Sequence, residues 1–509
     1  MDFDMIEALK AKAHHAGNQA IAQVMSKKKD TLADQWVDYK YWLRIWAGSM
    51  SISAKAPDEV REAMFRYPWT RISLKSMRMI KNWNIGRGGM ALKESYANFD
   101  ARVQLSKKGG GMVDLFCDPE HTVLYNAMVP VEVFDAMGLK HFSVETPANM
   151  VAMMDQNSPQ PYYDDLYNEG LPSDTCTYAS LTPAFVEDDQ IPGGRCPCLV
   201  ASNLPCEGGS ASWAIMQEKF GIPTYRLDIP ADFQENPQAV KDFAEDLRGM
   251  IAFLEEHTGH TMDWDKLRHI CENMNTCMRA EMERFELNRS MDPPVCGDLL
   301  WSTHMNFFNL VAGSDAATEL YTGLAKIGRQ MHEAGECSVK NMQYRAVLWN
   351  PPSFCYSNMW NWLERCWGIG IVMDMESYLS PIYIDTRTHD GMIEGLAEEW
   401  CYAPMARHNR GPAGNWLGAV DEVSKLYRPD FILNMNHIGC RASVGLEGAM
   451  KDWSKESGIP VCIVDHDFYD SRVVSRQGVR DQVNRFMQDI MHATPLDPTL
   501  LSFDDSEVW

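Results

Sequence analysis

Short apolar segments alternate with amphipathic helical segments along most of the chain, and this alternation limits the possible folds most strongly. In the first half we expect apolar strands and helices in turn; the strands are 141–145, 196–202 and 223–229, and the helices are 129–138 and 210–221. Apolar residues at i, i+3 and i+4 mark the helices, whereas short continuous apolar runs mark strands buried on both faces. Strands joined through helices pair in parallel, because each helix carries the chain back to the same end of the sheet.

The second half of the chain repeats the same alternation. Its expected strands are 344–350, 369–375, 430–436 and 459–467, and its expected helices are 357–368, 443–458 and 479–493. We therefore expect an α/β fold with two doubly wound (Rossmann- or flavodoxin-like) parallel-sheet domains. No exact sequence repeat relates the two halves.

The chain of 509 residues is long enough for about three domains of about 150 residues each. Residues 1–110 are expected to form a helical N-terminal extension, because the apolar residues of IEALKAKAHHAGNQAIAQVM recur at helical spacing. The stretch LSKKGGGM (105–112) breaks that pattern. An amphipathic packing layer explains this extension better than a membrane or cofactor segment. Residues 111–290 are the first α/β domain with a helical linker, and residues 291–509 are the second.

Charge and hydropathy exclude several classes of protein. Lys and Arg number 47 against 70 Asp and Glu, a net charge of −23, whereas binding to nucleic acid or to anionic lipid needs a basic face. No apolar run reaches the roughly 18 residues of a membrane span, and the start MDFDMIEALKAKAHH lacks the apolar core of a signal peptide. We therefore expect a cytoplasmic protein.

The 14 cysteines are too sparse in 509 residues for a disulfide scaffold, so each one packs in the core, binds metal or acts as a nucleophile. The sequence contains no phosphate-binding loop of the G-x-x-x-x-G-K-[ST] type, no G-x-G-x-x-G after a strand, no H-E-x-x-H and no C-x-x-C. Hydrolysis of ATP and binding of NAD through a dinucleotide fingerprint are therefore not expected.

Three cysteines lie where a parallel sheet binds its ligands. Cys206 follows the strand at 196–202, and Cys440 follows the strand at 430–436, each just before a helix. Open α/β sheets bind ligands beyond the carboxyl ends of their strands, and a helix N-terminus stabilises a thiolate. Cys176, in LPSDTCTYASLTPAF, also lies between a turn and a helix. Thiolates in such positions suit iron–sulfur ligation or nucleophilic catalysis, and core packing is the alternative for each one taken singly.

From about residue 120 to 495 the chain resembles the 2-hydroxyacyl-CoA dehydratase / benzoyl-CoA reductase family, closest to its larger, alpha-type subunits. The resemblance is carried by VPVEVFDAMGL, SDTCTYASL, CLVASNLPCEGGSASW and DLRGMIAFLEEHTGHTMDWDKLRHICENMN. It continues through NHIGCRASVG, GIPVCIVDHDFYDSR and VNRFMQDI. The order and the spacing of these segments are more specific than any one of them.

The resemblance implies an anaerobic, heterodimeric enzyme in which each subunit holds a [4Fe–4S] cluster between two α/β domains. Carried over residue by residue, the cluster ligands are Cys176, Cys206 and Cys440. The implied partners are a smaller homologous beta-type subunit and an ATP-hydrolysing iron–sulfur activator. The activator injects one low-potential electron, and the acyl-CoA thioester carbonyl becomes a ketyl radical. A dehydratase (a lyase) of this family then expels a hydroxyl group from a 2-hydroxyacyl-CoA, whereas a benzoyl-CoA reductase (an oxidoreductase) reduces the ring.

Large subunits of the dehydratases tend to carry Gly-Tyr-Ala-Arg after the first cysteine, whereas Cys176 is followed by Thr177, Tyr178, Ala179 and Ser180. The absent arginine leaves the polarity of the substrate open. The N-terminal extension is also longer than the family leads us to expect.

Three side chains are candidates for proton transfer near the cluster. Glu207 and His437 lie close to two of the proposed ligands in sequence, and Glu132 begins a helix just after a proline. Each of two candidates also has a structural alternative. His437 could be a loop histidine that bonds to the backbone. Glu132 could be a carboxylate in the first turn of a helix, stabilised by the helix dipole.

The phosphates of CoA need a local basic patch on this acidic chain. The candidates are Arg407, His408 and Arg410, or Lys107 with Lys108, although each group also fits an ordinary solvated loop. Asp465 and Asp467 lie at the end of the expected strand 459–467, and capping the next segment explains them better than contact with a polar substrate group.

Other functions stay open at this stage. One is a reductase subunit of the benzoyl-CoA type or one with a double-cubane cluster. Another is a non-catalytic subunit that relays electrons or acts as a scaffold. A structural zinc protein fits less well, because zinc takes four nitrogen or sulfur ligands and only three widely separated cysteines stand out.

Overall fold

The structure is a computed structural model, and two parallel sheets with covering helices form its centre. It describes residues 32–55, 58, 84, 87, 89–106, 111–126, 128–154, 159–168, 170, 172, 174–204, 207–309, 313–356, 358–409 and 412–502. Cys206, Lys107, Lys108, Arg410 and most of the expected helical extension lie outside these residues, as does the side chain of Glu207.

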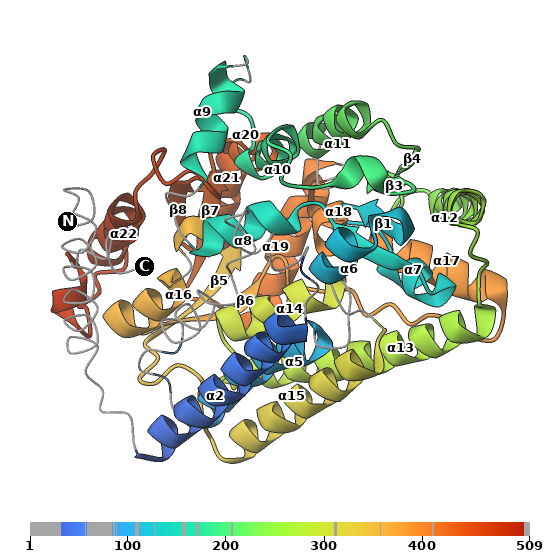
Figure 1. Ribbon diagram of the computed structural model, residues 1–509. Helices are drawn as coiled ribbons and strands as arrows, with labels where there is room; N and C mark the ends of the chain where they lie inside the picture. Colours follow the sequence, from blue (N-terminus) through green and yellow to red (C-terminus); the bar gives the residue numbers. More distant parts are fainter. Residues whose placement is uncertain are drawn as a thin grey trace, which may run out of the picture.

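The first half of the described chain runs from helix α2 through four strands to two long helices, α12 and α13 (Figure 1). Its elements are α2 (Leu32–Lys55), α5 (Gly89–Ser106), α6 (Met112–Cys117), β1 (Thr122–Tyr125), α7 (Val131–Met137), β2 (Lys140–Ser143), α8 (Thr146–Met154), α9 (Gln160–Asn168), α10 (Thr177–Glu187), β3 (Leu199–Ser202), α11 (Glu207–Phe220), β4 (Thr224–Leu227), α12 (Pro237–Thr258) and α13 (Trp264–Asn288).

The second half contains the other four strands and the helices around them. Its elements are α14 (Asp298–Asn309), α15 (Asp315–Glu333), β5 (Tyr344–Trp349), α16 (Met359–Trp362), β6 (Ile369–Asp374), α17 (His389–Cys401), α18 (Pro404–Asn409), α19 (Ala413–Tyr427), β7 (Phe431–His437), α20 (Arg441–Gly445), α21 (Glu447–Ser457), β8 (Val461–His466) and α22 (Arg476–Arg485). Helices α16 and α22 each continue as one π-helical turn.

The two sheets share one topology. Their strand orders are β2-β1-β3-β4 and β6-β5-β7-β8, and every pairing is parallel. The expected doubly wound α/β fold is therefore confirmed, although the domain boundaries at 110 and 290 stay predictions. In both sheets the direction of winding reverses between the first and third strands in chain order, so this position is where an open sheet of this kind binds ligands.

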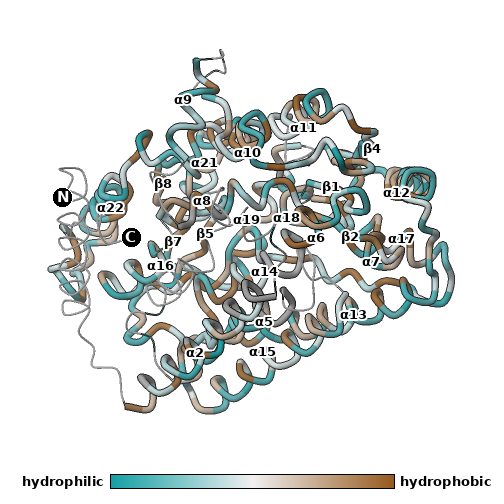
Figure 2. Tube along the Cα trace, in the orientation of Figure 1, coloured by the Kyte–Doolittle hydropathy of each residue, from teal (hydrophilic) through white to brown (hydrophobic). Residues whose placement is uncertain are grey.

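Both faces of each sheet are buried, as continuous apolar strands require. Neighbouring residues of β1 alternate between two hydrophobic cores: Val123 and Tyr125 pack in one, and Leu124 in the other. Each core contains residues from both sheets, so the two sheets and their helices pack as one body. Helix α12 shows the matching amphipathic pattern, with Phe243, Leu247 and others buried and hydrophilic turns facing outward (Figure 2).

A buried ion triad joins helix α5 to helix α13. Helices α2, α5, α13 and α15 lie together along one side of the molecule (Figure 1). Between them, the Arg284 guanidinium of α13 donates to Glu281 at 2.6 Å and to Glu94 of α5, and the three side chains have at most 4% exposure. Burial raises the pKa of Glu94 to about 7 although Arg284 opposes this shift. An uncompensated charge at this position would cost several kcal/mol.

Candidate functional site

The carboxyl ends of the third strand of each sheet carry two of the predicted cysteine ligands. Strand β7 ends at His437, and Cys440 then forms the N-cap of α20, where its Sγ accepts a bond from the Ser443 amide at 3.5 Å. In the other sheet β3 ends at Ser202, and α11 begins directly after Cys206. Cys206 and Cys440 thus follow equivalent strands, one in each sheet, at the point where ligands bind to such folds.

Cys176 lies against the loop that carries Cys440. It forms the N-cap of α10, and Gly439 packs on its backbone so closely that a Cβ at position 439 would lie 2.8 Å from the Cys176 Cα. Only glycine allows two main chains to approach in this way. The structure therefore brings together two predicted ligands, one from each half of the fold and each at the start of a helix.

His437 links these two loops through its side chain. Its Nε2 lies 3.3 Å from the Sγ of Cys176, and its ring packs on Phe468 with centroids 4.0 Å apart. Its Nδ1 is 3.6 Å from the Asp467 carboxylate, which is too long for a hydrogen bond. Burial lowers the pKa of His437 to about 3, so the imidazole is neutral at physiological pH. A neutral ring can donate one N–H to a thiolate sulfur.

Asp467 has the capping role that its position after a strand indicated. Its Oδ1 accepts bonds from the Thr177 hydroxyl at 2.6 Å and from the amides of Tyr469 and Asp470. Burial raises its pKa. These bonds fix the turn after β8 against the first turn of α10, and they therefore help to position Cys176. Asp465 is exposed and bonds to Asn436 instead.

A buried group of acids and tyrosines adjoins Cys176, and the sequence patterns give no sign of it. Tyr178 of α10 bonds to Glu145 and stacks on Tyr469 with ring centroids 6.0 Å apart. Glu376, just after β6, accepts a bond from the Trp301 indole, and burial raises its pKa to about 8. Tyr178 follows Cys176 by two residues at the start of α10, so the stacked tyrosines lie next to the cysteine in the fold. A carboxyl with this pKa stays protonated at neutral pH and can supply a proton.

Glu132 has different surroundings from those expected near a cluster. It is buried in the first turn of α7, beside Glu399 and Trp400 of α17, and burial raises its pKa to about 7. These contacts join α7 to α17, and a role for Glu132 at the cysteine site stays a prediction.

Arg407 and His408 are buried and form no open basic patch. The Arg407 guanidinium donates to the Ser380 hydroxyl at 2.7 Å and to the Tyr378 carbonyl, and it lies over the Tyr378 ring. His408 is also buried in α18. The expectation of a solvated loop is therefore wrong for these two residues, because both side chains are buried, and a role in CoA binding stays a prediction.

Most of the other cysteines are buried thiols in apolar surroundings. Burial raises the thiol pKa of nine of them, to about 11 for Cys355, to about 12 for Cys196, Cys198, Cys277, Cys366 and Cys401, and further for Cys271, Cys296 and Cys462. Such thiols stay protonated and are poor metal ligands. Cys176 and Cys440 are half-buried instead.

The donor set around Cys176 and Cys440 fits an iron–sulfur cluster. Thiolate sulfurs are the usual ligands of such clusters, and hydrogen bonds to those sulfurs tune the potential. The Ser443 amide and the His437 ring supply such contacts here. Within the described residues, no three His, Cys, Asp or Glu side chains form a complete metal site. The third predicted ligand, Cys206, lies outside the described residues, so the complete ligand set stays a prediction.

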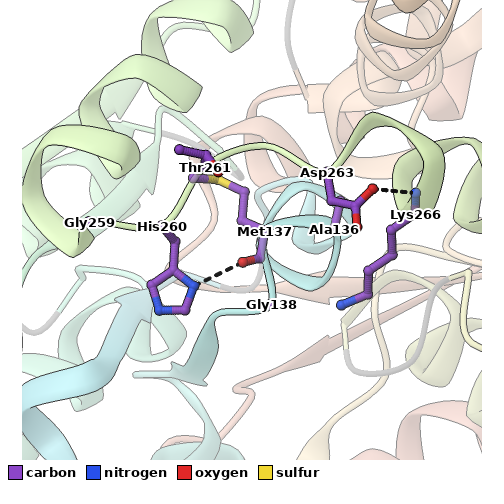
Figure 3. Close-up of a pocket in the computed structure, with 8 residues that line it drawn as sticks. All are labelled: Ala136, Met137, Gly138, Gly259, His260, Thr261, Asp263 and Lys266. Carbon is purple, nitrogen blue, oxygen red and sulfur yellow. Dashed lines mark hydrogen bonds between the residues drawn. The ribbon is translucent and has the colours of Figure 1, made fainter.

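A hollow at the opposite edge of the first sheet is separate from the cysteine site (Figure 3). It lies where α7 ends and where α12 turns into α13, and its lining residues are Ala136, Met137, Gly138, Gly259, His260, Thr261, Asp263 and Lys266. His260 bonds to the Met137 carbonyl at 3.0 Å, and Asp263 caps α13. Its polar groups thus already hold the turn together.

Two comparisons with known proteins found matches to this chain. The family model of the 2-hydroxyglutaryl-CoA dehydratase D-component matches residues 126–490, which include the three predicted ligands and every strand of both sheets except β1. One of the subunits of the benzoyl-CoA reductase of Thauera aromatica is 21% identical over 351 residues, which cover 64% of this chain and 78% of that relative. No helix in the described ranges is both long and apolar enough to cross a membrane.

Proposed function

Because the chain belongs to the 2-hydroxyglutaryl-CoA dehydratase D-component family, we propose that it is the iron–sulfur subunit of an acyl-CoA dehydratase. In this proposal Cys176, Cys206 and Cys440 ligate a [4Fe–4S] cluster. One observation carries the proposal: Gly439 brings the loop of Cys440 onto the backbone of Cys176, so the main chains that bear these two cysteines meet. Packing of the hydrophobic core does not require two half-buried cysteines to lie on such closely packed loops.

The cluster, when bound, supplies a low-potential electron to the thioester of a 2-hydroxyacyl-CoA. The protein's own groups then hold the sulfurs and the protons. In the tautomer that carries its proton on Nε2, the neutral His437 ring would donate to the Cys176 sulfur, 3.3 Å away, and so stabilise the thiolate. Glu376 keeps a proton at neutral pH next to the stacked tyrosines. Glu207, His437 and Glu132 remain the proposed residues for proton transfer.

Two partners belong to this proposal. The electron enters from an ATP-hydrolysing iron–sulfur activator, which agrees with the lack of a phosphate-binding loop in this chain. A smaller homologous beta-type subunit completes the enzyme, in line with the similarity to one subunit of a multi-subunit reductase.

A reductase of the benzoyl-CoA type is the second candidate. The sequence identity to one chain of such an enzyme favours it. Ser180 also stands where dehydratases tend to carry arginine, and its buried hydroxyl bonds to the Cys176 carbonyl at 3.1 Å. No cation is therefore available at this position for a polar acyl group.

The test is activity of the anaerobically purified complex with its partner subunit, the activator, ATP and a strong reductant. Loss of water from a 2-hydroxyacyl-CoA supports the dehydratase, and ring reduction of benzoyl-CoA supports the reductase. Either activity must disappear in Cys440→Ser and persist in Cys117→Ser, because Cys117 is an exposed cysteine on α6. A complex that binds iron but acts on neither substrate contradicts both, and it favours a relay or scaffold subunit.

A further inference from the structure

Two of the other cysteines lie side by side outside the candidate site. Cys296 is fully buried just before α14, and Cys337 is half-buried shortly after α15. The Ser338 amide bonds to the Pro293 carbonyl at 3.3 Å, and the Cys296 sulfur lies 4.0 Å from the same oxygen. The two loops are thus joined, and the thiols of Cys296 and Cys337 bond to each other.

This pair lies at the edge of the second sheet opposite to the candidate site. A Cβ at Gly370, the second residue of β6, would lie 3.6 Å from the Cys296 sulfur, and the Gly297 amide bonds to the Ile371 carbonyl of the same strand at 2.8 Å. Cys440 instead follows the carboxyl end of β7, which runs parallel to β6. A strand of this length spans about 20 Å. The pair is therefore remote from the proposed cluster, and its chemistry is independent of the iron–sulfur proposal.

The surroundings of Cys337 favour its thiolate form. The bond with Cys296 is the main reason that the pKa of Cys337 lies below the ordinary value of a thiol, and the Val339 amide acts in the same direction. Partial burial and two acids, Asp292 and Glu364, oppose this shift. Burial raises the pKa of Cys296 instead, so its thiol keeps its proton and can donate to the sulfur of Cys337.

A buried cation lies near both thiols. The Arg345 guanidinium donates to the carbonyls of Ser290 at 2.7 Å and Tyr427 at 2.9 Å, and its charge acts on both Cys296 and Cys337. Peroxides oxidise thiolates that lie beside a cation and are partly open to solvent, and a neighbouring thiol then resolves the product. A thiol that only fills an apolar core needs none of these partners.

We propose that Cys296 and Cys337 form a peroxide-sensitive pair that closes into a disulfide. The Cys337 thiolate attacks one oxygen of hydrogen peroxide, and the O–O bond breaks. Cys337 becomes a sulfenic acid, and the other oxygen leaves as hydroxide, which becomes water with the proton that Cys337 released. The Cys296 sulfur then attacks the sulfenic sulfur, and its proton leaves with the sulfenic hydroxyl as a second water.

The two thiols thus supply the two electrons that reduce the peroxide, and the disulfide fastens the start of α14 to the end of α15. The test is peptide mapping of the full chain, purified without oxygen and then treated with a small excess of hydrogen peroxide. The free peptides of Cys296 and Cys337 should be lost, and one linked pair should replace them. Dithiothreitol should restore the free peptides. Peroxide treatment that leaves both thiols free, or links either one to another cysteine, overturns the proposal.

Two serine variants separate the roles of the thiols. In Cys296→Ser no disulfide with Cys337 can form, so dimedone, which traps sulfenic acids, should label Cys337. In Cys337→Ser dimedone should leave Cys296 unlabelled. The control Cys117→Ser removes an exposed cysteine on α6 and should retain the linked peptides of the wild type.

The assignment of roles is overturned if dimedone labels Cys296 in Cys337→Ser or fails to label Cys337 in Cys296→Ser. It is equally overturned if dimedone labels Cys337 as strongly in the wild type as in Cys296→Ser, because Cys296 then does not resolve the sulfenic acid.

Discussion

The substitution Gly439→Ala tests whether the contact between the two cysteine loops is needed. The added Cβ would lie 2.8 Å from the Cys176 Cα, 2.9 Å from the Thr175 carbonyl oxygen and 3.0 Å from the Cys176 nitrogen. All three are backbone atoms, so no side chain can rotate away to make room. Two carbons normally pack at about 3.5–4.0 Å, and the loops must therefore separate by about 1 Å.

This separation has a cost in stability and a second one in metal binding. Overpacking of a tight contact typically costs about 1–3 kcal/mol, so we expect the free energy of unfolding in urea to fall by this amount. Metal ligands must lie within about 0.2 Å of their ideal distances, so a shift of 1 Å displaces one thiolate from the cluster. We expect the affinity for iron to fall at least tenfold, as it does when a supporting contact of a metal site is removed.

Gly448→Ala is the matched control, because Gly448 lies in the first turn of α21 and nothing is within 4 Å of a Cβ placed there. Alanine favours helix, so this variant should be unchanged or more stable by up to about 1 kcal/mol. The reasoning is refuted if Gly439→Ala retains both the unfolding free energy and the iron content of Gly448→Ala.

Three further predictions follow from buried polar groups. Arg284→Met leaves two buried carboxylates unpaired and should lower the free energy of unfolding by about 3–5 kcal/mol, whereas Arg329→Met, which breaks an exposed ion pair, should cost less than about 1 kcal/mol. The pKa of Glu376 is raised from 4.5 to about 8, so the folded protein favours the protonated carboxyl. This preference contributes fully to the free energy of unfolding below about pH 4.5. The contribution falls, by at most about 5 kcal/mol, as the pH rises to about 8. Glu376→Gln should remove this decline from a pH series of unfolding curves, and a decline that persists would assign it to other groups. His437→Ala should weaken iron binding about 10–100-fold in a chelator competition, and unchanged binding would show that its contact with the thiol is incidental.

The strand–helix alternation predicts the fold well because each element carries its own signal. The pattern of 129–138 predicts a helix that ends at Gly138, and α7 does end there, because Gly138 adopts the left-handed conformation of a C-cap at φ 69°. Strand β1 is not predicted although it lies inside its sheet, since four residues are too few to show a period. Its place becomes evident only when β2 and β3 pair on either side of it.

The candidate site is partly predictable for the same reason. The sequence places Cys176 and Cys440 at the starts of helices, and both are N-caps in the structure. His437 is a candidate through its closeness to Cys440 in sequence, but its contact with Cys176 spans 261 positions of the chain and has no local signal. Glu376 looks like an ordinary acid after a strand, since its burial depends on the packing of Trp301 from α14.

The basic segment around Arg407 shows how local composition can mislead. MARHNRGPAG looks like a solvated loop, because charged residues and glycine gather there. Residues of α17 and α19 cover α18 instead, and the guanidinium finds its partners in the turn that contains Tyr378 and Ser380. Burial of a charged side chain is a property of tertiary contacts, which sequence patterns do not report.

The central claim is that three cysteines from two α/β halves hold one iron–sulfur cluster. Its most direct test is the amount of iron and acid-labile sulfide per chain in protein purified without oxygen. The wild type and Cys117→Ser should each contain about four irons and four sulfides, and Cys176→Ser, Cys206→Ser and Cys440→Ser should each lose them. Little iron in the wild type, or equal iron in all five proteins, would contradict the claim, and about eight irons per chain would replace the single cluster with a double cubane.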